Sequence, residues 1–264
     1  MSAKENDISA ISNQKSVRIQ GQEYKIYSCG TIANLKKASM SSGNILESKE
    51  LLSKYHIEVL RYSILSDLSQ GVKELTDADF LSSEKKLYYF YQTLNNIKNF
   101  ANENSELNDS IALHGRIIKL DIVDGIKANF LSAINDDFNT SLVISEFIQV
   151  FKYANALLDN VNENPLHKLT TLNKIVKNIL AVANLLGIFL EEPKDFILEM
   201  KEKYIKLNHI DRKEIEELLD LRQDAKYKKN YELSDEIITI LDQKGIIVQD
   251  SPLGYEWDIK ELFI

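Results

Sequence analysis

The spacing of apolar residues along the chain predicts a mainly helical protein with short β-strands at both ends. In 16–33, apolar residues lie between turn signals at Gln20-Gly21 and Cys29-Gly30, which indicates two or three short strands. Beyond this segment, apolar residues recur at the spacing of amphipathic helices. The helical spacing is present in 45–66, 77–99, 120–135, 135–158 and 166–190.

We interpret 45–200 as one all-helical unit of about four to six helices. Within 45–66, Ser48 is a candidate cap for a first helix and a second helix is expected to start near His56. The last helix of the unit is expected to end at Gly187. Asp136 and Asp137 could suggest a metal site, but their place before an apolar-periodic run favours helix capping.

Polar stretches set the expected breaks between these elements. Residues 1–15 lack periodicity and are expected to form a disordered tail. Residues 101–109 are interpreted as a loop, and 194–209 as a charged connector.

The pattern changes again in 205–264, which we interpret as a separate ααββ module. Asp211 and Glu214 have the spacing of a capping box, and helices are expected over 215–229 and 231–243. Two apolar segments flank Ser251-Pro-Leu-Gly254, as in a β-hairpin.

Composition narrows the class of protein. The chain has 264 residues, and only three prolines and nine glycines, which favours long helices with few breaks. A net charge of −8 argues against a generic nucleic-acid binder, so any basic strip must be local. The single cysteine, Cys29, excludes an intramolecular disulfide framework and favours a cytoplasmic location. No apolar run approaches the ~18 residues of a membrane span, and no signal peptide is evident.

The stretch Lys36–Asn44 is a candidate anion-binding loop. It contains two lysines, three hydroxyl side chains within four residues, and a final Gly-Asn pair. Backbone N–H groups, hydroxyls and lysines of such a loop can surround a phosphate. The alternative is a solvated turn between a strand and a helix.

Residues 221–257 carry a specific motif. The chain has Leu221-Arg-Gln-Asp-Ala-Lys-Tyr-Lys-Lys-Asn-Tyr-Glu-Leu-Ser-Asp-Glu, followed by Gly245-Ile-Ile-Val-Gln-Asp-Ser-Pro-Leu-Gly-Tyr-Glu-Trp257. This resembles the C-terminal domain of bacterial cysteinyl-tRNA synthetases, whose pattern is R-x-x-A-(R/K)-x-x-x-(D/N)-(W/Y/F)-x-x-(A/S)-D, then G-(I/V)-x-(L/V)-x-D-(T/S/G)-P-x-G-x-x-W. Every position of that pattern has a counterpart here at matching spacing.

Three upstream segments agree with the same family. Ala133-Ile-Asn-Asp-Asp-Phe-Asn-Thr140 is similar to a segment that opens a helix of its anticodon-binding bundle, and Glu58-Val-Leu-Arg-Tyr62 resembles its stem-contact helix. The loop Lys36–Asn44 is similar to the K-M-S-K-S-L-G-N loop of class I synthetases, which binds ATP. The resemblance covers about 30–258. It implies a stem-contact and DALR-like helical domain at 45–200, and an anticodon-recognition module at 205–264.

The loop departs from the family pattern at one position of chemical importance. The matching residues are Lys37, Ser39, Ser41, Gly43 and Asn44. Met40 replaces the lysine that is expected to stabilise pyrophosphate charge during amino-acid activation. Loss of such a transition-state contact typically costs ~10²–10³ in rate. We treat these six residues as a remnant of the ATP loop, and assign no catalytic residue.

Two further family features are absent from the sequence. The H-I-G-H motif of the nucleotide-binding half is not present, and a zinc site of two cysteines, a histidine and a glutamate cannot form around Cys29 alone. Ile26-Tyr-Ser-Cys-Gly-Thr31 resembles the segment of the family's first zinc ligand, and the alternative for Cys29 is a small buried residue. ATP and zinc are thus cofactors of the family, and we expect no metal in this chain.

The resemblance assigns anticodon recognition to Lys226, Tyr231, Asp235, Asp250 and Trp257. Tyrosine can stack on an unpaired base, and carboxylates can accept from guanine N1–H and N2–H₂. Alternatively, Trp257 is hairpin core, Asp235 a surface residue, and the nearby lysines a solvated helix face.

These features leave three hypotheses open. The chain can be the tRNA-binding part of a cysteine–tRNA ligase for tRNA-Cys with a GCA anticodon, acting with a separate nucleotide-binding half. It can also be a non-catalytic tRNA-binding paralogue, or a remnant that binds protein. In each case we expect the isolated chain to be inactive in cysteine activation.

Overall fold

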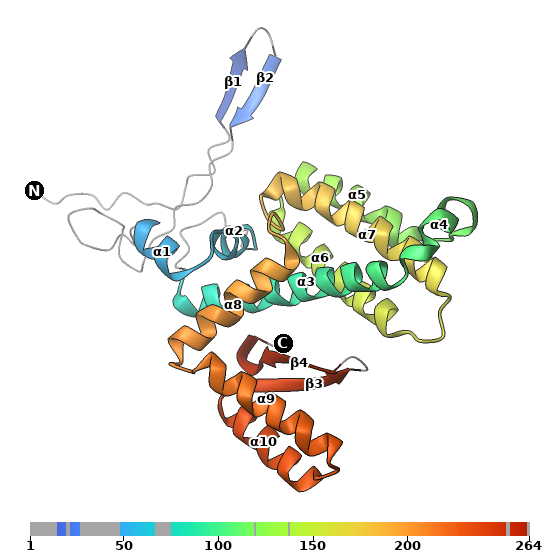
Figure 1. Cartoon of the computed structure of the whole chain (residues 1–264). Coiled ribbons are helices and arrows are strands. Elements are labelled where there is room, and N and C mark those ends of the chain that lie inside the picture. Colours follow the sequence, from blue (N-terminus) through green and yellow to red (C-terminus); the bar gives the residue numbers. More distant parts are fainter. Residues whose placement is uncertain are drawn as a thin grey trace, which may run out of the picture.

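The computed structural model confirms a mainly helical protein, with one small antiparallel sheet at each end of the chain (Figure 1). The structure describes residues 15–19, 22–26, 48–66, 75–118, 120–136, 138–251 and 254–262. No helix among these residues is long and apolar enough to cross a membrane.

The first sheet is a hairpin of β1 (Lys15–Ile19) and β2 (Gln22–Ile26). Its antiparallel register pairs Ile19 with Gln22. The predicted turn signal Gln20-Gly21 lies outside the described residues. The candidate phosphate loop 36–44 and Cys29 lie outside the described residues.

The helical unit is built around one long central helix, α3, which contacts α2, α6, α7 and α8. Among the described residues of this unit, two short helices precede α3, and five α-helices and a 3₁₀ turn follow it. Their bounds are α1 (Ser48–Lys54), α2 (Ile57–Leu65), α3 (Asp77–Glu103), the 3₁₀ turn η2 (Ser105–Leu107), α4 (Asn108–His114), α5 (Leu120–Asn135), α6 (Thr140–Asp159), α7 (Pro165–Leu186) and α8 (Pro193–Leu207).

Local capping fixes several of these helix ends, and two of them, near His56 and at Gly187, lie where the sequence predicts. The imidazole of His56 accepts from the Glu58 N–H at the start of α2. Asn139, rather than Asp136, caps α6 by accepting from the Leu142 N–H. Gly187 ends α7 with a φ of 68°, a left-handed conformation that glycine adopts without steric cost.

Stacked aromatic rings fill the centre of the unit. Phe90 of α3 stacks on Phe151 of α6 at 4.4 Å between ring centroids, and Tyr91 stacks on Phe196 of α8 at 4.0 Å. Phe189, from the loop between α7 and α8, lies edge-on to both Phe90 and Tyr91. Such pairs contribute roughly 0.5–1.5 kcal/mol each beyond the burial of their area.

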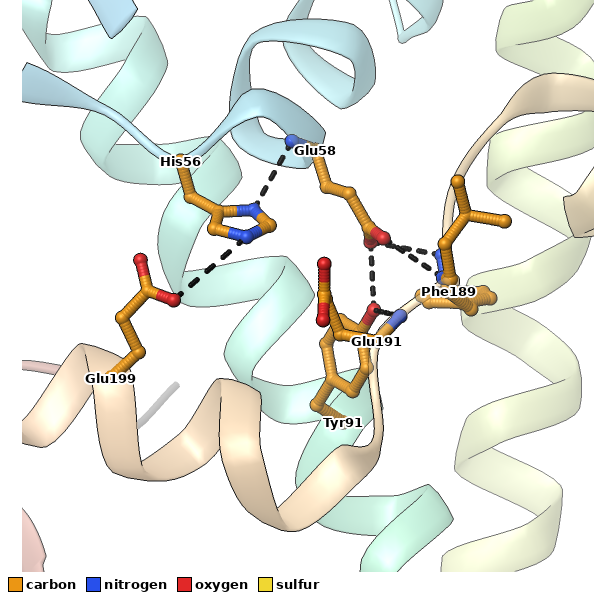
Figure 2. A network of polar contacts seen from close by, with 7 residues as sticks. His56, Glu58, Tyr91, Phe189, Glu191 and Glu199 are labelled. Carbon is orange, nitrogen blue, oxygen red and sulfur yellow. Dashed lines mark hydrogen bonds and ion pairs between the residues drawn. The ribbon is translucent and has the colours of Figure 1, made fainter. Parts of the chain in front are cut away.

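A buried carboxylate anchors α2 to the α7–α8 loop (Figure 2). Glu58 is only 1% exposed, and its Oε2 and Oε1 accept from the N–H groups of Phe189 and Leu190 at 2.9 and 2.8 Å. The hydroxyl of Tyr91 donates to Glu58 Oε2 at 2.8 Å and accepts from the Glu191 N–H at 3.3 Å. In this way one side chain joins α2, α3 and the loop before α8.

Glu58 and its neighbours explain the stem-contact motif in structural terms. Val59 and Tyr62 are buried with Glu58, and Arg61 is the exposed member, donating to the Gly187 carbonyl at 2.9 Å. Three of the five motif residues therefore support the fold.

The predicted connector at 194–209 is wrong, because most of it is helix α8. Pro193 occupies the first turn, where its missing N–H has no cost. Phe196, Met200 and Ile205 are buried, and α8 packs on α3. Their helical spacing is obscured by the many charged residues on the exposed face, which led to the interpretation as a connector.

The predicted loop at 101–109 is also wrong. Helix α3 continues to Glu103, η2 follows, and α4 starts at Asn108. The Asn104 side chain donates to the Phe100 carbonyl at 2.8 Å and covers the end of α3. Short helical turns whose polar side chains are solvated show no apolar pattern, so the sequence analysis missed them. The described part of the unit therefore contains more helices than the four to six that we predicted.

The C-terminal residues form two helices and a hairpin, as predicted. Helices α9 (Arg212–Tyr227) and α10 (Tyr231–Gln243) pack on each other, and α10 packs on β3. Strand β3 (Ile246–Ser251) pairs antiparallel with β4 (Gly254–Ile259), and the short turn η3 (Lys260–Leu262) follows. Asp211 caps α9, but Glu214 pairs with Lys244 at 2.9 Å instead of completing the predicted capping box.

Strand β4 joins this module to the helical unit. The Asp258 carboxylate accepts from the Tyr88 hydroxyl and the Gln92 amide of α3. Lys201 of α8 donates to the Trp257 carbonyl at 2.6 Å. Apolar residues of the two parts belong to one continuous core. The predicted domain boundaries, with breaks near 15, 44 and 200–205, stay predictions.

We expect Glu58→Ala to destabilise the chain by roughly 3–5 kcal/mol, because the buried Phe189 N–H, the partly buried Leu190 N–H and the Tyr91 hydroxyl lose their acceptor. Urea unfolding followed by circular dichroism measures the loss. Glu58→Gln keeps one acceptor oxygen and is expected to lose less, and Glu103→Ala, at the exposed end of α3, is the control. A loss for Glu58→Ala no larger than that of the control would contradict the anchoring role.

Candidate nucleic-acid interface

A hollow of about 680 Å³ lies between α9 and the turn end of the β3–β4 hairpin. The hydroxyl of Tyr255 of β4 donates to Asp220 at 2.9 Å. The hollow is lined by Asp220, Gln223, Asp224, Lys226, Tyr227, Asp250 and Gly254. Two of the predicted site residues, Lys226 and Asp250, thus belong to one surface.

Two of the lining residues, Lys226 and Asp250, form a charged cluster with Arg222, which is not part of the lining. Arg222 donates in a bidentate arrangement to both oxygens of Asp250, at 2.8 and 2.9 Å. Lys226 lies 2.8 Å from Asp250 Oδ2. The Arg222 side chain is only 4% exposed, whereas that of Asp250 is 46% exposed. The buried Arg222 guanidinium therefore fixes the Asp250 carboxylate, which remains exposed to solvent.

The same contacts control ionisation in the cluster. Hydrogen bonds from Arg222 and then Lys226 hold the pKa of Asp250 far below its ordinary value, since they stabilise the charged form. The pKa of Arg222 is raised, first by its hydrogen bond to Asp250 and also by the charge of Asp235. Asp250 is therefore an anion near neutral pH, able to accept hydrogen bonds.

Tyr231 and Asp235 lie on one face of α10, one turn apart, and outside the lining of the hollow. The Tyr231 side chain is 62% exposed and Asp235 is exposed. The charge of Asp235 acts on the same guanidinium that binds Asp250. The two predicted carboxylates therefore share one electrostatic neighbour.

Trp257 lies at the joint with the helical unit rather than in the hollow. Its ring is half-buried, and the Lys201 ammonium lies 4.7 Å from the ring centroid in a cation–π contact. Burial lowers the pKa of Lys201 in spite of the nearby carboxylates. A role of Trp257 in RNA contact stays a prediction.

The basic strip beside the hollow is partly neutralised. Lys226 pairs with Asp250, and Lys228 pairs with Asp224 at 2.6 Å. Lys229 follows at a φ of 59° and turns the chain into α10. Such exposed pairs are weak, so they can give way to a phosphate group.

Two residues of this surface received no role in the sequence analysis, although Arg222 is the first arginine of the quoted motif. Arg222 precedes Lys226 by one helical turn, a spacing that places both on one face of α9 and could have identified it. Tyr227 is the most exposed of the large hydrophobic residues near the hollow, at 87%, and no sequence pattern separates an exposed tyrosine from a buried one.

Residues predicted for ATP and metal binding are not placed by the structure. The remnant loop residues Lys37, Ser39, Met40, Ser41, Gly43 and Asn44 lie outside the described residues, as does Cys29. Within the described ranges, no group of three or more histidine, cysteine, aspartate or glutamate side chains could hold a metal ion.

Comparison with known proteins shows what this chain is similar to. The family model of the DALR domain matches residues 129–191, which include the end of α5 and all of α6 and α7. A cysteine–tRNA ligase of Geotalea uraniireducens is 31% identical over 233 residues, which are 86% of this chain and 47% of that protein. The chain is a relative of the cysteine–tRNA ligases.

Other cysteine–tRNA ligases match similar shares of this chain and of their own length. That of Thermodesulfovibrio yellowstonii is 28% identical over 90% of this chain and 48% of its own length. That of Syntrophobacter fumaroxidans is 28% identical over 86% of this chain and 47% of its own length. The chain thus spans about half the length of these cysteine–tRNA ligases, and the resemblance seen in the sequence is confirmed.

We expect Arg222→Gln to raise the pKa of Asp250 toward the ordinary value of about 3.9, because the bidentate donor is lost. Because the pKa of Asp250 is depressed by folding, the stability that it contributes is present above about pH 3.9 and is lost as the pH falls further. Carboxyl NMR titration measures the pKa. Lys228→Ala, which removes the partner of Asp224, is the control, and an Asp250 titration unchanged by Arg222→Gln would contradict the assignment.

Proposed function

We propose that this chain is the tRNA-binding part of a cysteine–tRNA ligase system and recognises tRNA-Cys through its GCA anticodon. The observation that carries the proposal is the surface at the junction of α9, α10 and the hairpin. It combines exposed tyrosines, an open carboxylate with a depressed pKa, and lysines in weak pairs. The names of the relatives support tRNA as the partner.

The chemistry of this surface suits an unpaired RNA loop. Tyr231 offers an exposed ring, and stacking of a base on such a ring is worth ~1–3 kcal/mol. Asp235 and Asp250 can accept hydrogen bonds from the edge of a guanine, while the lysines can attract the RNA backbone. A surface that bound only phosphate would have no use for the carboxylates.

The proposal assigns ATP-dependent cysteine activation to a separate nucleotide-binding half. ATP and zinc are expected for that half, and the tRNA-binding part is expected to act in the cytoplasm. The alternative of a non-catalytic tRNA-binding paralogue is favoured by Met40, which leaves the loop without its central cation. The alternative of a protein-binding remnant is favoured by the acidic net charge of −8.

We expect the chain to bind tRNA with a GCA anticodon in a salt-sensitive manner, and Tyr231→Ala to weaken binding by about 5- to 150-fold, the equivalent of one lost stack. Asp235→Ala is expected to reduce the preference for GCA over other anticodons. Fluorescence anisotropy with labelled tRNAs at two salt concentrations measures both. Glu236→Ala, an exposed neighbour on α10, is the control. Equal affinity for all tRNAs in every variant would favour the protein-binding alternative.

We expect the isolated chain to give no cysteine-dependent exchange of pyrophosphate into ATP. The family's H-I-G-H motif is absent from this sequence, and Met40 cannot stabilise pyrophosphate charge. An exchange assay with labelled pyrophosphate measures this, with a full-length cysteine–tRNA ligase as the positive control. Exchange above the level without cysteine would show that the chain activates cysteine itself.

A further inference from the structure

We propose that His56 is a proton-controlled switch at the junction of α2 and α8. In its neutral form the imidazole caps the start of α2, and in its charged form it gives up that cap and pairs with Glu199 of α8. The inference goes beyond the proposed function and does not depend on RNA binding, so its tests use the chain alone.

The cap on α2 requires a neutral ring. Nδ1 of His56 accepts from the Glu58 N–H at 3.2 Å (Figure 2). A histidine nitrogen accepts a hydrogen bond only when it carries no proton, and the neutral ring then has its proton on the other nitrogen. Nε2 is therefore the protonated nitrogen while His56 caps α2. A proton on Nδ1 would place two N–H donors opposite each other and end the hydrogen bond.

Glu199 offers a partner to the charged ring. Its Oε2 lies 4.0 Å from His56 Nε2, a distance that is too long for a hydrogen bond but within the range of an ion pair (Figure 2). The Glu199 side chain is 59% exposed, so it has room to move toward the ring. The two partners thus lie at opposite nitrogens, and the charged ring can keep only Glu199.

Burial makes the charged ring depend on this carboxylate. Only 10% of the His56 side chain is exposed, and the ring packs edge-on against Phe196 of α8 with 5.1 Å between ring centroids. Little water can hydrate an imidazolium in this position. A nearby opposite charge then has to replace the lost hydration.

The other ionisable groups at this junction are engaged elsewhere. Each has a partner on α3 or in the loop between α7 and α8. The pairs are Lys54 with Asp77, Tyr55 with Asp77, Lys203 with Glu84, and Glu58 with Tyr91 and the N–H groups of Phe189 and Leu190. Figure 2 shows one further carboxylate, that of the exposed Glu191. Glu199 is the carboxylate that pairs with the ring itself.

The switch acts on the helix that anchors the helical unit. Glu58, whose N–H loses its acceptor when the ring is charged, is also the residue whose carboxylate holds the α7–α8 loop. The new ion pair forms on α8, which follows that loop. Acid is therefore expected to loosen the start of α2 and to strengthen its attachment to α8.

A double-mutant cycle on the full chain tests the exchange of partners. Near pH 5.5 free imidazoles are mostly charged and free carboxylates are mostly ionised, whereas near pH 8 imidazoles are neutral. We expect Glu199→Gln to raise the unfolding equilibrium constant by ~2- to 5-fold at the lower pH and to leave it nearly unchanged at the higher pH, because only the ion pair is lost. Urea unfolding at both pH values measures the two constants.

His56→Asn completes the cycle, because asparagine caps a helix but does not ionise. In this background Glu199→Gln is expected to have the same small effect at both pH values, whichever other histidines titrate. Glu236→Gln, the same substitution at an exposed position of α10, is the matched control for the change in net charge. An effect of Glu199→Gln that is equal at the two pH values in the unmodified background would overturn the pairing with the charged ring.

Nitrogen NMR of the unmodified chain follows the cap itself, so this measurement does not require any variant to fold. We expect a proton on Nε2 and none on Nδ1 of His56 near pH 8, and protons on both nitrogens near pH 5.5. The Glu58 amide resonance should move together with the imidazole resonances. The Leu142 amide, which is capped by the non-ionising Asn139, is the matched control and should not follow them. A proton on Nδ1 at the higher pH, or a Glu58 amide that does not follow the ring, would overturn the switch.

Discussion

The buried carboxylate of Glu58 is the contact on which the arrangement of the helical unit depends. A charged group with 1% exposure is tolerated only when its hydrogen-bonding capacity is filled, and here two backbone N–H groups and a tyrosine hydroxyl fill it. The N–H groups belong to the turn between α7 and α8, so the carboxylate fixes the direction in which α8 leaves the bundle. Since α8 carries Lys201, which binds the carbonyl of Trp257, the position of the C-terminal hairpin follows from this contact.

At the candidate interface, by contrast, a charged side chain is exposed to solvent and is held in place by a buried side chain. Arg222 is packed between α9 and the hairpin, and it presents Asp250 to solvent without allowing the carboxylate to turn away. Pre-organisation of this kind reduces the entropy lost when a ligand binds. The neighbouring tyrosines have few internal degrees of freedom and large apolar faces, which suits them to the same task.

The sequence predicted those elements whose apolar face, cap and turn residues agree with one another. Helices α5 and α7 and the C-terminal hairpin are of this kind, and Gly187 ends α7 as expected. Helix α8 was missed because only three of its residues are buried, among many charges. For the interface, the family resemblance assigned a role to Lys226 but none to Arg222 of the same motif, because the sequence does not show that this guanidinium binds the distant Asp250. The placement of Trp257 at the joint likewise depends on α8, an element that the sequence did not reveal.

The antiparallel register of β3 and β4 has a consequence for how this protein can change over time. Asp250 pairs with Tyr255, and Val248 pairs with Trp257, so the interface and the joint with α8 share a ladder of hydrogen bonds. A slip of one residue in this ladder would turn Asp250 away from Arg222 and displace Trp257 from Lys201 in the same step. An insertion or deletion in the hairpin would therefore disrupt both the contact of Asp250 with Arg222 and that of Trp257 with Lys201. A substitution at an exposed position of the hairpin would leave both contacts in place. Lineages of this protein should vary in side chains along the hairpin while its length stays constant.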